Sequence, residues 1–170
     1  MVKEYDKPIF IDVKNLDLGD KDLEQECIDG IRNLSDNQTF GVLATHGEGG
    51  ILTSLVAFAA DSDLKHIVFT TPMNTTKYSN IIMNPNITLL IDNRSDQPDS
   101  INQINALNIA GSASVINGGL AMEKWVGVYL KKHPNLVDFV NTSLNAVILV
   151  EVGKCAFVSK FQQVFEWYPD

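Results

Sequence analysis

The sequence has few cysteines and histidines, and this scarcity argues against several kinds of site. Its 170 residues contain two cysteines, Cys27 and Cys155, which lie far apart and form no CxxC motif. The three histidines, His46, His66 and His133, stand singly, so the chain lacks the ligand spacing of a structural zinc site. We therefore expect free thiols, no metal site and a reducing compartment.

Long apolar runs and an excess of basic residues are also missing. No stretch approaches the ~18 apolar residues of a membrane-spanning helix, and the first residues lack the apolar core of a signal peptide. The formal net charge is −8, whereas binding to nucleic acid or to anionic lipid requires a basic surface. We expect a cytoplasmic protein that has neither nucleic acid nor a membrane as its partner.

The motifs of hydrolases and dinucleotide-binding enzymes are absent as well. The sequence contains no GxSxG, no HExxH and no GxGxxG turn. His46 lies in a glycine-rich turn between two expected strands, and we interpret it as a solvated loop residue. A protein without an acid–base set of its own can obtain its chemistry from a bound cofactor.

The N-terminal segment carries much of the acidic charge and predicts one amphipathic helix. Residues 1–36 hold ten acidic and five basic residues. A short apolar patch at residues 9–11 predicts an arm or an edge strand. Asp20 is a suitable N-cap for a helix that ends near residue 37, because apolar residues recur at helical spacing at Leu23, Cys27, Ile28, Ile31 and Leu34. We predict a single structural domain. Within it, residues 1–36 form an N-terminal arm and helix, and residues 37–170 form the main, split-barrel part.

Alternating and β-branched runs predict about seven strands in the main domain. They cover residues 40–45, 51–60, 66–70, 86–92, 107–116, 146–152 and 154–158. Short turns join the first three strands and require antiparallel pairing. Further helices are expected at residues 76–84, 120–132 and 136–141. We predict a mainly β protein, a six- to seven-stranded antiparallel split β-barrel flanked by short α-helices, because closure removes the sheet edges.

The segment 66–86 predicts a strand, a polar turn and a short helix that ends before Pro85. A helix start carries free backbone N–H groups and partial positive charge. Hydroxyl groups and one lysine add to this, which predicts a phosphate-binding site, and the alternative is a surface turn with a solvated lysine. The candidate residues are Thr70, Thr71, Thr75, Thr76 and Lys77.

Aromatic residues and one strand segment are candidates for contact with a flat ring. The segment 53–58 begins with Thr53, Ser54, Leu55 and Val56, although an ordinary amphipathic strand has the same pattern. Trp125 and Tyr129 are four residues apart on a predicted helix, which is typical of a core pair. Trp167 lies near the C-terminus, where chain segments are ordered only if they dock, and a partner subunit is one candidate for that docking.

Together these segments resemble the pyridoxamine 5′-phosphate oxidase-like, FMN-binding split-barrel family. The resemblance covers roughly residues 36–116, and it rests on FGVLAT, TSLVAF, HIVFTTPMNTTKYSNIIMNPNITLLI and ALNIAGSASV. It implies a homodimer with FMN at the subunit interface. It also implies a flavin-dependent oxidoreductase whose substrate is unknown.

The resemblance assigns roles to particular residues. The segment 53–58 would lie along the flavin, and Thr70 and Thr71 would lie near its ring or ribityl chain. Thr76 and Lys77 would bind the phosphate. Trp167 is similar to the C-terminal tryptophan that contacts flavin in the oxidases.

Several positions differ from the oxidases. Thr53 and Thr76 stand in place of arginines, Ala106 stands in place of a glutamine, and no arginine or histidine follows Trp167. Oxidation of pyridoxamine phosphate itself is therefore not expected. Two alternatives stay open. One is a split barrel that binds a deazaflavin or haem, with His46 or His66 as the haem ligand, and the other is a binding protein without catalysis.

Overall fold

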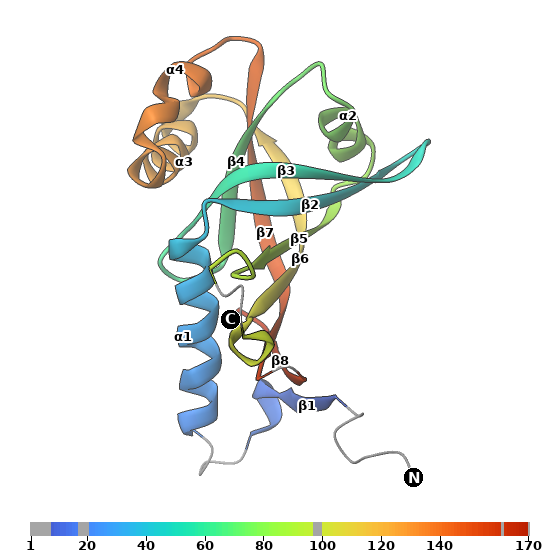
Figure 1. The fold of residues 1–170 in the computed structure, drawn as a ribbon. Helices are drawn as coiled ribbons and strands as arrows, with labels where there is room; N and C mark the ends of the chain where they lie inside the picture. Colours follow the sequence, from blue (N-terminus) through green and yellow to red (C-terminus); the bar gives the residue numbers. More distant parts are fainter. Residues whose placement is uncertain (1–7, 17–20, 97–99, 161, 170) are drawn as a thin grey trace.

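The computed structural model describes residues 8–16, 21–96, 100–160 and 162–169 (Figure 1). Eight strands form one sheet in the order β1-β8-β7-β4-β3-β2-β5-β6, and β6 also pairs with β7. Strands β2 to β7 therefore close into a six-stranded barrel whose neighbours are all antiparallel. The predicted mainly β, antiparallel split barrel is confirmed.

The barrel is built from six strands, with two more strands outside it and helices at its ends and side. The strands are β1 (Ile9–Asp12), β2 (Phe40–Gly47), β3 (Gly50–Ala60), β4 (His66–Pro72), β5 (Asn86–Asp92), β6 (Ala106–Ile116), β7 (Asn145–Ser159) and β8 (Gln163–Trp167). The α-helices are α1 (Lys21–Asn37), α2 (Thr76–Met83), α3 (Gly119–Lys132) and α4 (Val137–Val140). Short 3-10 helices lie at Val13–Asn15, Ile101–Gln103 and Pro134–Leu136.

Two strand predictions at the C-terminal end are wrong. β7 passes through Gly153 without the break that we expected there. β6 pairs with Val152 and with Lys154, and Gly153 between them is the extra residue of a β-bulge. Residues 163–167, for which we predicted no strand, form β8 between β7 and β1. The arm at residues 9–11 is the predicted edge strand, and it pairs with β8 in parallel.

The position of His46 also differs from the prediction. His46 lies within β2 and pairs with Ile51 of β3, so the hairpin turn is confined to Glu48 and Gly49. Residues of β2 alternate between the barrel interior and its outer wall. His46 is on the outer wall, where its side chain is exposed.

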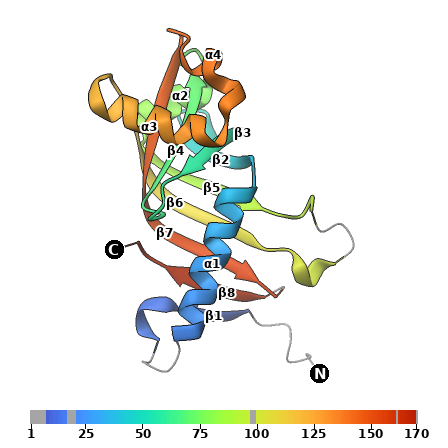
Figure 2. The same cartoon turned by 90° about the vertical axis from the view of Figure 1, so that its left-hand side faces the viewer.

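Two apolar clusters hold the helices to the barrel. The interior cluster contains residues such as Leu43, Phe58 and Phe69, and it continues into Cys27 and Ile31 of α1. Figure 2 shows α1 passing in front of β6, β7 and β8, at the end of the barrel from which these strands extend.

A second, smaller cluster lies outside the barrel, beneath α3. Val68 and Val147 pack there against Trp125 and Tyr129, which confirms the predicted core role of these two aromatic residues. Among the helices of the described residues, none has the length and apolar composition needed to cross a membrane.

Candidate functional site

β3 and β4 separate over part of their length, and this opening is the split of the barrel. Their pairing ends at Phe58 and Phe69. The same register would place Val56 opposite Thr71, but in the described chain β3 continues along β2 and β4 continues along β7. Each strand therefore presents unpaired backbone N–H and C=O groups to the opening, and such groups need partners.

The start of α2 lies beside this opening. Thr75 is its N-cap: the Thr75 hydroxyl accepts a bond from the Tyr78 amide at 3.4 Å and donates one to the Pro72 carbonyl at 2.8 Å. The amides of Thr76 and Lys77 occupy the first helical turn, where no intrahelical acceptor exists. The structure thus brings the predicted strand segment and the predicted helix start to one opening.

Lys77 and Thr76 point in different directions from α2. Lys77 shares a helix face with Asn80 and Ile81, three and four residues further on, and both of these residues are buried against the barrel. Lys77 is accordingly half-buried, whereas Thr76 is exposed. Asn80 fixes the helix, because its amide donates to the Thr45 hydroxyl of β2 at 3.1 Å.

The two threonines at the end of β4 also face opposite ways, as alternation along a strand requires. Thr71 lies on the opening side, with its hydroxyl 3.3 Å from that of Thr75. Thr70 lies under α3 beside Tyr129. Burial raises the pKa of the Tyr129 phenol, and the Thr70 hydroxyl opposes this shift. Thr70 therefore faces away from the opening.

The predicted residues of β3 divide between two environments. Val56 is buried in the barrel interior and Ser54 is half-buried on the same side. Thr53 and Leu55 are exposed on the outer wall. The backbone of this segment borders the opening, and its side chains point alternately to the barrel interior and to the outer wall.

Trp167 lies far from the start of α2 within one chain. It pairs with Cys155 of β7, whereas Pro72, next to α2, pairs with Asn145 of the same strand. These ten residues correspond to roughly 30 Å along a strand. Trp167 is half-buried and packs against the interior cluster, so a single chain does not bring Trp167 and Lys77 together.

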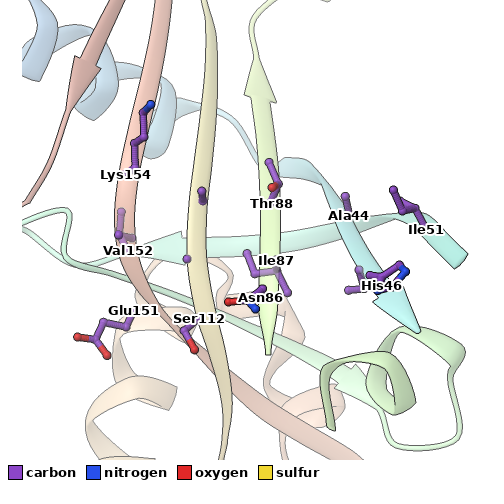
Figure 3. A pocket seen from close by; sticks show the side chains of 14 residues that line it. Ala44, His46, Ile51, Asn86, Ile87, Thr88, Ser112, Glu151, Val152 and Lys154 are labelled. Atoms are coloured by element: carbon purple, nitrogen blue, oxygen red, sulfur yellow. The ribbon is translucent and has the colours of Figure 1, made fainter. Parts of the chain in front are cut away.

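A trough on the outer wall is a feature that the sequence did not predict (Figure 3). It crosses β2, β5, β6 and β7, with a volume of about 640 Å³. Its floor is made of small residues, which are Ala44, Thr88, Ala110, Gly111 and Gly153, and its rim is polar, with His46, Asn86, Ser112, Glu151 and Lys154. The signal in the sequence is the row of small residues at outward positions, which becomes visible only when the strand register is known.

Gly111 has a specific role in this floor. The pairing of β6 with β7 shifts register between Ala110 and Gly111, and a Cβ at Gly111 would overlap the Glu151 carbonyl. A glycine inside a strand often marks a bulge or a close backbone approach, and at Gly111 the structure shows both.

The histidines have different surroundings. His46 is on the trough rim, with Nδ1 3.5 Å from the Asn84 side-chain amide nitrogen. The Nδ1 atom of His66 is 2.8 Å from the Asp61 carboxylate, and its ring lies 4.9 Å from that of Trp125. Of these two candidate haem ligands, His46 is therefore the one beside a cavity large enough for a planar group.

The outer wall also carries exposed apolar side chains. Phe40, Ile51 and Leu55 are 52%, 77% and 64% exposed. The register of β2 and β3 places them on one face, together with His46 and Val42. Larger exposed apolar patches are typical of interaction surfaces.

A family model described as pyridoxamine 5′-phosphate oxidase matches residues 28–167 of the chain. The chain belongs to this family. No curated protein sequence matches it, so the family relation rests on this model and on the fold.

Solved structures of the same fold have low sequence identity to this chain. A heme binding protein from Mycobacterium smegmatis has a TM-score of 0.74 and 17% identity, over 84% of this chain and 58% of that one. HutZ, a heme storage protein from Vibrio cholerae, has a TM-score of 0.68 and 11% identity, over 81% and 96% of the two chains. An FAD-binding protein from Mesorhizobium loti has a TM-score of 0.61 and 11% identity, over 78% and 91%. At these identities the similarity shows the fold alone.

Proposed function

We propose that the protein binds FMN in the opening between β3 and β4 and acts as a flavin-dependent oxidoreductase. The observation that carries the proposal is the convergence of two unpaired strand edges with the start of α2 and Lys77. Membership of the pyridoxamine 5′-phosphate oxidase family supports it. A flavin-binding protein among the structures of the same fold is in keeping with it.

The residues at the opening fit the two ends of an FMN molecule. The amides of Thr76 and Lys77 and the Lys77 ammonium offer donors to a phosphate. The hydroxyls of Thr71 and Thr75 lie close to each other, and Thr75 also donates to Pro72, so we assign them to holding the helix start in place. The edge of β3 at residues 53–56 offers N–H and C=O groups to a flavin ring.

A bound flavin would supply the electron transfer, and this chain would bind and orient it. At the opening, the described residues contribute hydroxyl, apolar and backbone groups, and Lys77 supplies the charge there. With so few titratable groups beside the site, the alternative of a binding protein without catalysis is retained. Turnover with reduced nicotinamide by the flavin-loaded protein distinguishes the two.

We further propose a homodimer formed through the outer wall of β2 and β3. Two observations support it: the exposed apolar side chains of Phe40, Ile51 and Leu55, and the roughly 30 Å along β7 that separate Trp167 from α2. If Trp167 contacts a flavin, as the resemblance to the oxidases implies, that flavin is the one bound by the partner subunit.

Haem is the second candidate ligand, and the trough is the observation that favours it. Its floor of small residues accommodates a planar group, and His46 on its rim offers an imidazole nitrogen. Two proteins of the same fold are described as a heme binding and a heme storage protein. Haem titration followed by absorbance, with His46→Ala beside the unmodified protein, tests this alternative.

We also propose a cytoplasmic location, on the basis of the thiols. Cys27 and Cys155 are free and buried. Burial raises the pKa of each thiol to about 12. Both therefore stay protonated and serve as small core residues, which is in keeping with a reducing compartment.

The proposed phosphate site is tested by comparing FMN with riboflavin, which lacks the phosphate. We expect Lys77→Ala to weaken FMN binding about tenfold, because a charge-assisted hydrogen bond is lost, and to leave riboflavin binding unchanged. Fluorescence titration measures both affinities. Lys21→Ala is the control, since it removes the same charge from the exposed start of α1. Equal effects of Lys77→Ala on both flavins would remove Lys77 from the phosphate site.

A further inference from the structure

A second ligand site is formed by a groove at the other end of β3 and β4. We propose that this groove binds an organic anion, a carboxylate or phosphate group attached to a compact apolar body. The groove has a volume of about 760 Å³ and lies between the end of α1, the part of α3 from Lys124 onward and the β3–β4 turn. It is separate from the opening and from the trough, with which it shares no lining residue.

Part of the groove lining is apolar. Ala59, Ala60 and Leu64 line it from the end of β3 and the following turn, and Val128 lines it from α3. Ala59 and Leu64 are buried, and Val128 packs against the cluster beneath α3. A compact apolar ring placed between these side chains would lose its own exposed surface, which favours binding.

One wall of the groove is fixed by a half-buried lysine. Lys132, at the end of α3, donates to the carbonyls of Ser35 and Gln38 at 2.6 and 2.7 Å. Its ammonium also lies 3.9 Å from the centre of the Phe58 ring. Burial lowers the pKa of Lys132 to about 8, and Asp36 opposes this shift. Lys132 therefore joins α3 to the end of α1 and positions the groove, and its donors are already in use.

The remaining cations of the rim are available to a ligand. Lys124 and Lys131 are exposed on α3 and form no ion pair with any described residue, although Lys124 lies over the Trp125 ring. Arg32 has its nearest carboxylate, that of Asp29, at 3.8 Å on the same helix, which is a loose and exposed contact.

Two of the three carboxylates of the groove accept hydrogen bonds from the protein itself. Both oxygens of Asp61 accept hydrogen bonds, from the backbone of Lys65 and from the backbone and ring of His66. Asp63 accepts a bond from the Ser62 hydroxyl. Asp36 is the third carboxylate of the lining; it is exposed and has no ion pair with a described residue. The lining therefore carries four basic and three acidic side chains, in a chain whose net charge is −8. This charge pattern selects an anionic ligand over a cationic one.

The test uses four small probes and isothermal titration calorimetry with the full chain. 1-Naphthoate and 1-naphthyl phosphate carry an apolar ring and an anion, 1-naphthylmethylammonium carries the ring and a cation, and inorganic phosphate carries the anion alone. We expect at least one of the two ring anions to bind at least about tenfold more tightly than either of the other probes. The ring anion that binds more tightly shows whether the groove prefers a carboxylate or a phosphate group.

Variants then locate the binding. Lys124→Glu and Lys131→Glu, each at an exposed position, are expected to weaken the ring anion at least about fivefold. Lys21→Glu makes the same charge change at the start of α1 and is expected to leave binding unchanged. Lys77→Ala is also expected to leave it unchanged, so the result is independent of the proposed flavin site. Circular dichroism confirms that each variant is folded.

Three results would overturn the proposal. The first is no measurable binding of either ring anion, and the second is equal binding of the ring cation. The third is binding that Lys77→Ala abolishes while Lys124→Glu and Lys131→Glu leave it intact, which would place the anion at the start of α2.

Discussion

Individual side chains hold the helices on this barrel. One of them, His133, makes the stability of the protein depend on pH. Its side chain is buried, and Nε2 lies 2.7 Å from the Phe58 carbonyl. Burial lowers the pKa of His133 below its usual 6.5, although the bond to Phe58 opposes the shift. In the unfolded chain the imidazole therefore takes up a proton at a higher pH than it does in the folded protein.

This difference predicts a loss of stability on acidification. As pH falls below 6.5, the unfolded state binds more protons than the folded state, so the free energy of unfolding falls by up to about 1.4 kcal/mol per pH unit. Urea denaturation between pH 7.5 and 5 measures it. His133→Gln is expected to flatten this dependence, and the exposed His46→Gln to retain it. An unchanged slope in His133→Gln would contradict the account.

At the residue scale, the capping role of a side chain could be predicted from the sequence. The face of a strand on which a side chain lies could not. The N-cap role of Thr75 follows from its position before the helix, and it is confirmed. The opposite directions of Thr70 and Thr71 depend on which face of β4 meets the interior. The sequence does not reveal this, because β4 is buried on both faces.

At the scale of single elements, two glycines inside helices can be compared, because only one of them has space for a Cβ. Gly30 of α1 faces Phe157 of β7, and a Cβ at Gly30 would overlap the Phe157 ring. Gly127 of α3 has open space at the same point. The sequence indicates only that each glycine weakens its helix by about 1 kcal/mol. The structure shows that Gly30 permits the close packing of α1 on β7.

Replacement by alanine should therefore have opposite effects at these two positions. Gly127→Ala is expected to raise the free energy of unfolding by up to about 1 kcal/mol through helix propensity. Gly30→Ala is expected to lower it by about 1–3 kcal/mol, because the buried Phe157 ring must move. Chemical denaturation measures both. A stabilising Gly30→Ala would show that α1 does not pack as described.

Most elements could be predicted from the sequence, and the exceptions have physical causes. β2 to β6 and the three longer helices agree with the periodicity signals, and α2 also agrees with its capping signal. Asp20, the predicted N-cap of α1, lies outside the described residues. Gly153 suggests a strand end, but it is the extra residue of a β-bulge, and β6 pairs with β7 on both sides of it. β8 lacks strong strand signals and is held by its two neighbours. The trough depends on the register of four strands, and single segments contain no information about it.

At the scale of the whole molecule, the account predicts a dimer through the outer wall of β2 and β3. Leu55→Glu should shift the protein from dimer to monomer, because a charge is placed in an apolar contact. Sedimentation velocity measures the mass of the particle. Leu120→Glu is the matched control, since Leu120 is even more exposed and lies on α3. A monomeric unmodified protein, or equal effects of both variants, would contradict the predicted interface.

The opening between β3 and β4 is the proposed flavin site, with the phosphate at the start of α2. The most direct test is a crystal structure of the protein with FMN. We expect phosphate density within hydrogen-bond distance of the Lys77 ammonium and the Thr76 amide, and ring density along residues 53–56 of β3. Flavin density in the trough beside His46, or a structure in which α2 contacts no ligand, would contradict it.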